Sequence, residues 1–144
     1  MSAHCLACGA IWTADETCRG RFEACLALEY EHPRAFGAVH HLTVLCYMLQ
    51  HNEYSRESWL EARQMLFDFM HNNVLPAAMR QRNRSRMDSG RRTTSITRAP
   101  KLAEFSTISW SHTIAQVRLD TPEIYCADVQ QWAAAVLADT ASFQ

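Results

Sequence analysis

Four stretches of the chain repeat apolar residues at the spacing of an α-helix. The first begins near Asp15 or Thr17, either of which can act as an N-cap, and reaches about Glu31. Proline at position 33 ends this helix, because proline disfavours helical geometry in the residue before it. The pattern predicts a helix with an apolar stripe that contains Cys18, Phe22, Cys25 and Leu26.

The second stretch, Val39 to His51, follows Gly37 and is apolar nearly all round. A helix of that kind is typically buried at the centre of a fold. The third stretch follows Ser55, a residue type that caps helices, and continues to Asn72. Its periodic residues, which should pack beside the second helix, are Trp59, Ala62, Leu66, Phe69 and Met70.

A fourth helix is predicted near the C-terminus, where Thr121, Pro122 and Glu123 supply an N-cap, a proline in the first turn and an acid. Its apolar stripe is Tyr125, Val129, Trp132 and Val136. Between Met79 and Ser109 the periodicity lapses, and the alternation at Thr94, Ile96 and Arg98 supports at most a short strand or hairpin.

Together these patterns predict a mainly α fold, a compact bundle of about four helices. At 144 residues and 48% hydrophobic, the chain is expected to form a single domain over residues 1–144 with a real core. The expected parts are an N-terminal metal-binding segment at about 1–18, the bundle at about 17–72 and 113–140, and an irregular basic insert at about 79–109.

Composition narrows the function classes. The four glycines are well separated, so no glycine-rich loop is available to hold a phosphate, and the common nucleotide-binding folds are disfavoured. No apolar run approaches the roughly 20 residues that cross a bilayer, and the N-terminus lacks an export signal. We therefore expect a cytoplasmic protein without a membrane segment.

Cysteine usage then suggests a metal. The cytoplasm keeps thiols reduced, so the six cysteines are expected to be ligands or core residues rather than disulfides. Cys5 and Cys8, followed by Gly9, form a C-x-x-C turn that can place two thiolates on one tetrahedral zinc ion. A redox pair would need a strand–helix–strand context, which the pattern does not predict, and a coincidental pair is the other alternative.

Two further ligands are needed, and helix geometry limits them. Cys18 and Cys25 are about 10 Å apart along a helix, and His40 and His51 about 16 Å, whereas ligands of one zinc lie within about 4 Å of each other. At most one of each pair can serve. The preferred prediction is a zinc ion bound by Cys5, Cys8, Cys18 and His40.

His51 is a strong competitor for the fourth position, because a simple antiparallel packing of the first two helices would place it beside Cys18. Either histidine could instead be a structural residue that is hydrogen-bonded to a carbonyl. His41 is expected to be structural or exposed, while Cys25, Cys46 and Cys126 are expected to be small core residues.

The predicted insert carries the positive charge. From Arg80 to Lys101 lie eight of the 14 basic residues and one acid, Asp88. This segment could contact nucleic-acid phosphates, but it has no interleaved aromatic residues, and a solvated loop is favoured. The arginines concerned are Arg80, Arg82, Arg84, Arg86, Arg91 and Arg92.

The chain has an N-terminal CxxCGA block at Cys5–Ala10 and central GxVHHLTV and LQH blocks at Gly37–Val44 and Leu49–His51. With these motifs it resembles an uncharacterised bacterial domain-of-unknown-function family. It differs from the usual pattern in having Leu6 and Asn52 where prolines are common. The resemblance supports grouping Cys5, Cys8, Cys18, His40 and His51, and it implies no activity.

Three functions follow as hypotheses. The first is a non-enzymatic binding or interaction module in which zinc attaches the N-terminus to the bundle. The second is a metal-dependent hydrolase with an open coordination position and His51 or Glu53 as general base. The third is a nucleic-acid-associated regulator that uses the segment from Arg80 to Lys101.

Overall fold

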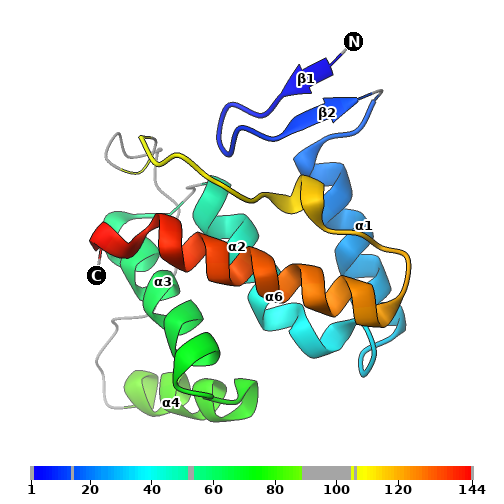
Figure 1. Cartoon of the computed structure of the whole chain (residues 1–144). Coiled ribbons are helices and arrows are strands. Elements are labelled where there is room, and N and C mark those ends of the chain that lie inside the picture. The colour runs from blue at the N-terminus through cyan, green and yellow to red at the C-terminus, as the bar shows by residue number, and fades with distance from the viewer. Residues whose placement is uncertain (1, 14, 52–53, 89–104, 106, 144) are drawn as a thin grey trace.

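The computed structural model describes residues 2–13, 15–51, 54–88, 105 and 107–143, with residues 2 and 83–88 described by their backbone alone. A short hairpin comes first (Figure 1). Strand β1 (Ser2–His4) pairs antiparallel with β2 (Ile11–Thr13), and Ala3 lies opposite Trp12. The patterns of apolar residues did not predict this hairpin.

The rest of the described chain is mainly helical, as predicted. The described residues include three short 3-10 helices, η1 (Gly37–Val39), η2 (Ile114–Gln116) and η3 (Ala141–Phe143), which lie between or after the longer helices. The α-helices are α1 (Cys18–Glu31), α2 (His40–His51), α3 (Arg56–His71), α4 (Pro76–Asp88) and α6 (Pro122–Asp139).

Predicted capping residues begin three of these helices. The side chain of Thr17 accepts a hydrogen bond from the backbone N–H of Gly20 at 3.0 Å, so Thr17 rather than Asp15 caps α1. The hydroxyl of Ser55 caps α3 and that of Thr121 caps α6 in the same way. These caps satisfy backbone donors that have no partner within the helix.

Helix α2 lies at the centre, where it packs against α3 and α6, which also pack against each other. In Figure 1 α1 flanks this group and the hairpin lies above the start of α1. The apolar stripes predicted for α3 and α6 meet here, and the fully buried residues include Trp59, Leu66, Tyr125, Val129, Trp132 and Val136. The core is thus built by the helical stripes, as expected.

Helix α4 corrects the prediction of an irregular insert at about 79–109, because its residues 76–88 are helical. The helix has a weak apolar pattern, which is why periodicity did not find it. Pro76 starts it, and arginine and glutamine favour helices. Buried Met79 and an ion pair between Arg82 and Asp68 at 3.1 Å attach it to α3. The alternation at Thr94, Ile96 and Arg98 lies outside the described residues.

A buried carboxylate connects the start of α6 to the segment before it. Asp128, only 4% exposed, accepts hydrogen bonds from the Arg118 guanidinium at 2.9 and 3.0 Å and from its backbone N–H at 2.9 Å. The bonds from the Arg118 side chain are the main reason why the pKa of Asp128 is lowered from its ordinary value. The carboxylate is therefore more stable ionised in the folded protein than in the unfolded chain.

We expect Asp128→Asn to lower the free energy of unfolding by about 1.5–3 kcal/mol at pH 7, the range for hydrogen bonds to charged groups. Because the folded pKa is depressed, this stability is present above the unfolded value of about 3.9 and is lost as the pH falls through the folded pKa. Urea denaturation of both proteins at pH 7 and pH 3 would measure it. If the wild type and Asp128→Asn differ in free energy of unfolding by the same amount at pH 7 and at pH 3, this explanation is contradicted.

Candidate metal centre

The cysteine pair occupies the turn between β1 and β2. The backbone N–H of Cys5 donates to the carbonyl of Ala10, and that of Gly9 donates to the carbonyl of Cys5, both at 2.8 Å. Gly9 has a φ of +80°, a conformation that glycine adopts without the strain of a side chain. The glycine after the pair therefore lets the turn close with Cys5 and Cys8 brought together.

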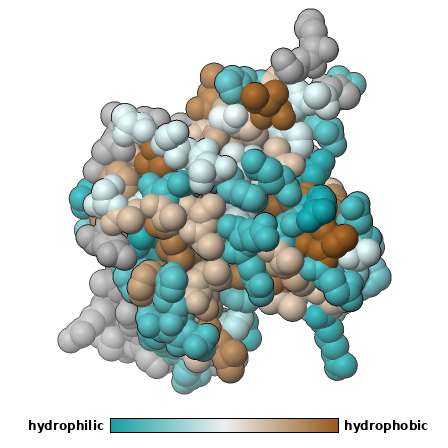
Figure 2. Space-filling view, viewed as in Figure 1, coloured by the Kyte–Doolittle hydropathy of each residue, from teal (hydrophilic) through white to brown (hydrophobic). Residues whose placement is uncertain are grey.

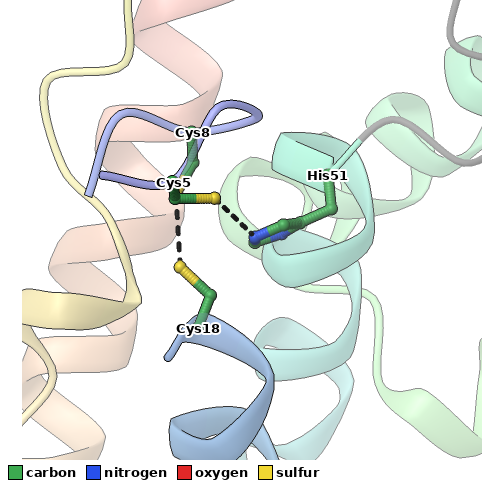
Figure 3. A group of neighbouring side chains, drawn as sticks. All are labelled: Cys5, Cys8, Cys18 and His51. Atoms are coloured by element: carbon green, nitrogen blue, oxygen red, sulfur yellow. Dashed lines mark hydrogen bonds between the residues drawn. The ribbon is translucent and has the colours of Figure 1, made fainter. Parts of the chain in front are cut away.

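Two helix ends approach this turn. Cys18 is the first residue of α1 and His51 is the last residue of α2. Figure 3 shows both side chains directed toward the turn. One ligand atom from each of Cys5, Cys8, Cys18 and His51 lies within 4.8 Å of the other three.

The individual separations fit one tetrahedral ion. The sulfurs of Cys8 and Cys18 are 3.6 Å apart, and the sulfur of Cys5 is 3.7 Å from Nε2 of His51. Ligands at about 2.3 Å (sulfur) and 2.0–2.1 Å (nitrogen) from a tetrahedral zinc ion would be about 3.5–3.8 Å apart. The cluster could therefore hold a metal ion with little rearrangement.

The orientation of His51 is determined by its own helix. Its Nδ1 donates a hydrogen bond to the backbone carbonyl of Tyr47 at 2.7 Å, which leaves Nε2 to face the cysteines. The Tyr47 ring stacks on the His51 ring at a centroid distance of 4.0 Å, and Phe22 stacks on the other side of Tyr47 at 3.9 Å. Such partners fix the tautomer and direction of a metal-binding histidine.

Trp12 supports the sulfur of Cys18. Its buried indole Nε1 donates to that sulfur at 3.1 Å, and the guanidinium of Arg21 lies 5.2 Å from the centre of the Trp12 ring. A hydrogen bond to a thiolate stabilises its negative charge. Neither Trp12 nor Tyr47 was identified from sequence, although Trp12 lies six residues before Cys18 and Tyr47 one turn before His51.

The thiols of the cluster differ in acidity. The pKa of Cys18 is lowered, mainly by the hydrogen bond from the Cys8 thiol and also by its contacts with His51 and Trp12. The pKa of Cys8 is raised, because its proton is held in that bond and its side chain is buried. One thiolate is thus favoured without metal, whereas a cation would favour ionisation of the remaining thiols.

The position of His40 corrects the preferred ligand set. His40 lies at the start of α2, at the opposite end from His51, and its Nδ1 is hydrogen-bonded to Glu29 at 2.7 Å. The chain folds back between α1 and α2, so the end of α2 rather than its start returns to Cys18. The structure therefore brings His51, and not His40, to the three cysteines.

The other cysteines lie away from the cluster. Cys25 and Cys46 are completely buried, as expected for core residues, and burial raises the pKa of Cys25 to about 11. Cys126 is only half buried, and its thiol donates to the carbonyl of Ala35. His41 is half buried against Phe69, with ring centroids 4.5 Å apart.

The structure describes only the first part of the basic segment from Arg80 to Lys101. Arg80 is exposed, and Arg82 forms the ion pair with Asp68. The side chains of Arg84 and Arg86, together with Arg91, Arg92 and Glu53, lie outside the described residues.

The chain was compared with models of protein families, with curated proteins and with solved structures. A model whose description reads "Family of unknown function (DUF5946)" matches residues 3–141. Neither the curated proteins nor the solved structures contain a match. Within the described residues, no helix is long and apolar enough to cross a membrane.

Proposed function

Because the chain belongs to DUF5946, a family of unknown function, we propose a role from the cluster itself: Cys5, Cys8, Cys18 and His51 bind a zinc ion that holds the N-terminal hairpin onto the helices. The observation that carries this proposal is the convergence of four ligand atoms from three separate elements within 4.8 Å. The protein is then a structural-zinc interaction module.

The donor set supports zinc among the common metals. Thiolate and imidazole ligands select zinc over magnesium or calcium, which prefer oxygen. A set of three cysteines and one histidine is also a common composition of structural zinc sites. An ion bound here would be largely enclosed by protein, because Cys8 and Cys18 are buried and Cys5 and His51 are half buried.

A structural role fits the elements that the ion would connect. Each strand of the hairpin has three residues, and an isolated two-stranded hairpin is at most marginally stable in water. A zinc ion bound by the hairpin and by both α1 and α2 would hold the hairpin in place, which its own few strand contacts cannot do. Four protein ligands also complete a tetrahedral shell, so the water that a hydrolytic zinc site needs would have no position.

The first test is the metal content of the untagged protein, purified without chelator under reducing conditions. We expect about one zinc per chain, the stoichiometry of a closed mononuclear site, by elemental mass spectrometry. Cys8→Ser and His51→Ala should each lose most of this zinc. His40→Ala should keep it, since the structure places His40 beside Glu29.

Cys126→Ser is the matched control, because it removes a half-buried thiol that lies outside the cluster. It should retain the zinc of the wild-type protein. A wild-type protein without metal, or equal zinc in the wild type and in His51→Ala, would contradict the proposal.

A further inference from the structure

A second group of polar side chains is buried where α1, α2 and α6 meet. The carboxylate of Glu29 in α1, only 3% exposed, accepts a hydrogen bond from the Thr43 hydroxyl of α2 at 2.7 Å and one from the Tyr125 hydroxyl of α6. Its other oxygen is bonded to Nδ1 of His40 at 2.7 Å. Nothing in the proposed zinc site uses this group.

Glu29 is also one of the residues that line an open pocket of about 590 Å³. This cavity lies along the end of α1, η1 and the start of α2, and Figure 1 shows this region at the end of α1 away from the hairpin. Its size falls within the range of small-molecule sites in proteins. The cavity is lined mainly by apolar surface, from Leu26, Glu29, Tyr30, Pro33, Gly37 and His40.

Gly37 lets η1 form one wall of this cavity. A Cβ atom at position 37 would lie 2.9 Å from the backbone oxygen of Glu29, closer than real Cβ atoms approach a backbone atom. The absence of a side chain therefore allows η1 to pack against α1. Because α2 begins directly after η1, this packing also brings His40 to Glu29.

The hydrogen bond with Glu29 places a proton on Nδ1 of His40, so Nε2 can accept a hydrogen bond when the imidazole is neutral. An ionised carboxylate only accepts, so Nδ1 of His40 is the donor in the bond with Glu29. A neutral imidazole with its proton on Nδ1 has a lone pair on Nε2. The His40 side chain is 57% exposed, and within the described part of the chain its Nε2 has no hydrogen-bond partner.

We propose that this cavity binds a small primary amine with an apolar body, whose ammonium group donates a hydrogen bond to Nε2 of His40. The hydrocarbon part would lie on Leu26 and Pro33 and cover apolar surface that is otherwise in water. This site is separate from the proposed zinc site, and neither proposal depends on the other.

The charge of the cavity favours a cation over an anion. Glu29 is the one carboxylate among its lining residues, and its other two partners, Thr43 and Tyr125, are neutral hydroxyls. An anionic ligand would be repelled by the negative charge buried beside the cavity, whereas an ammonium group would be attracted to it. The exposed ring of Tyr30 adds an aromatic face on which a cation can rest.

The test compares three probes with the same six-carbon chain: hexylamine, hexanol and hexanoate. Each is titrated into the zinc-containing protein at pH 7.5 while the ring signals of His40 are followed by NMR. We expect hexylamine to shift the His40 signals and to bind more tightly than hexanol. Hexanoate should bind least. His40→Gln should weaken hexylamine binding about tenfold or more, the value of a hydrogen bond to a charged group.

His4→Gln is the matched control, because it removes an exposed histidine of β1 and should leave binding unchanged. Leu26→Ser provides a second variant that alters the apolar wall, and it should also weaken binding. The proposal is overturned if hexylamine leaves the His40 signals unmoved or if hexanoate binds more tightly than hexylamine. It is also overturned if His40→Gln binds hexylamine as well as the wild type does.

Discussion

Cys18→Ser is expected to abolish zinc binding and to lower the free energy of unfolding by about 5 kcal/mol or more at pH 7.5. The reason is that structural zinc contributes on the order of 10 kcal/mol to folding, and Cys18 is the ligand that connects α1 to the hairpin. Chemical denaturation of both proteins under reducing conditions would measure the difference. Trp12 would at the same time lose the sulfur to which it donates.

Chelation separates the loss of metal from other effects of this substitution. A strong zinc chelator should destabilise the wild-type protein but leave Cys18→Ser unchanged, because the variant has no zinc to lose. Cys126→Ser, which alters a thiol outside the cluster, should respond to chelator as the wild type does. A wild-type protein whose stability is insensitive to removal of zinc would argue against a structural metal.

Trp132→Ala is expected to lower the free energy of unfolding by about 3–5 kcal/mol, the usual result of deleting a large buried aromatic side chain. Trp132 is completely buried in α6, and its Nε1 donates to the side-chain oxygen of Gln50 at 3.1 Å. The amide nitrogen of Gln50 donates in turn to the backbone carbonyl of His112 at 2.6 Å. The variant therefore leaves both a cavity and a buried amide oxygen without its partner.

Two further variants test the physical cause of this loss of stability. Trp132→Phe keeps much of the packing and removes the hydrogen bond, so it should cost less, about 1–3 kcal/mol. Trp110→Ala removes a tryptophan that is only half buried and should also cost less than Trp132→Ala. Chemical denaturation of the three variants, with zinc content measured on the same samples, tests this order. Equal losses from Trp110→Ala and Trp132→Ala would contradict it.

The hairpin presents apolar side chains to solvent. Leu6 is 98% exposed and Ile11 is 64% exposed, and Figure 2 shows hydrophobic surface at the hairpin end of the molecule. Leu6 lies between the two cysteines of the turn, so the conformation that brings their thiols together also directs this side chain outward. In contrast, Trp12 points inward from the same hairpin and is 4% exposed.

Local patterns were sufficient for the helices of the core. The stripes of α3 and α6 and the caps at Ser55 and Thr121 were predicted from residues close together in the chain, because cap chemistry and helical periodicity are local properties. Helix α4 was missed, since it has little apolar periodicity and its described contacts with α3 include buried Met79 and the ion pair between Arg82 and Asp68. The hairpin was missed too, because three-residue strands give too short a pattern.

The sequence by itself determined that Cys5 and Cys8 share one turn, that Cys18 begins a helix, and that His40 and His51 cannot belong to one site. These conclusions follow from residue spacing and the rise of a helix. The choice between the two histidines required the tertiary structure, because it depends on how α2 folds back against α1. That packing is decided by contacts between distant residues, including the bonds that Glu29 makes with α2 and α6.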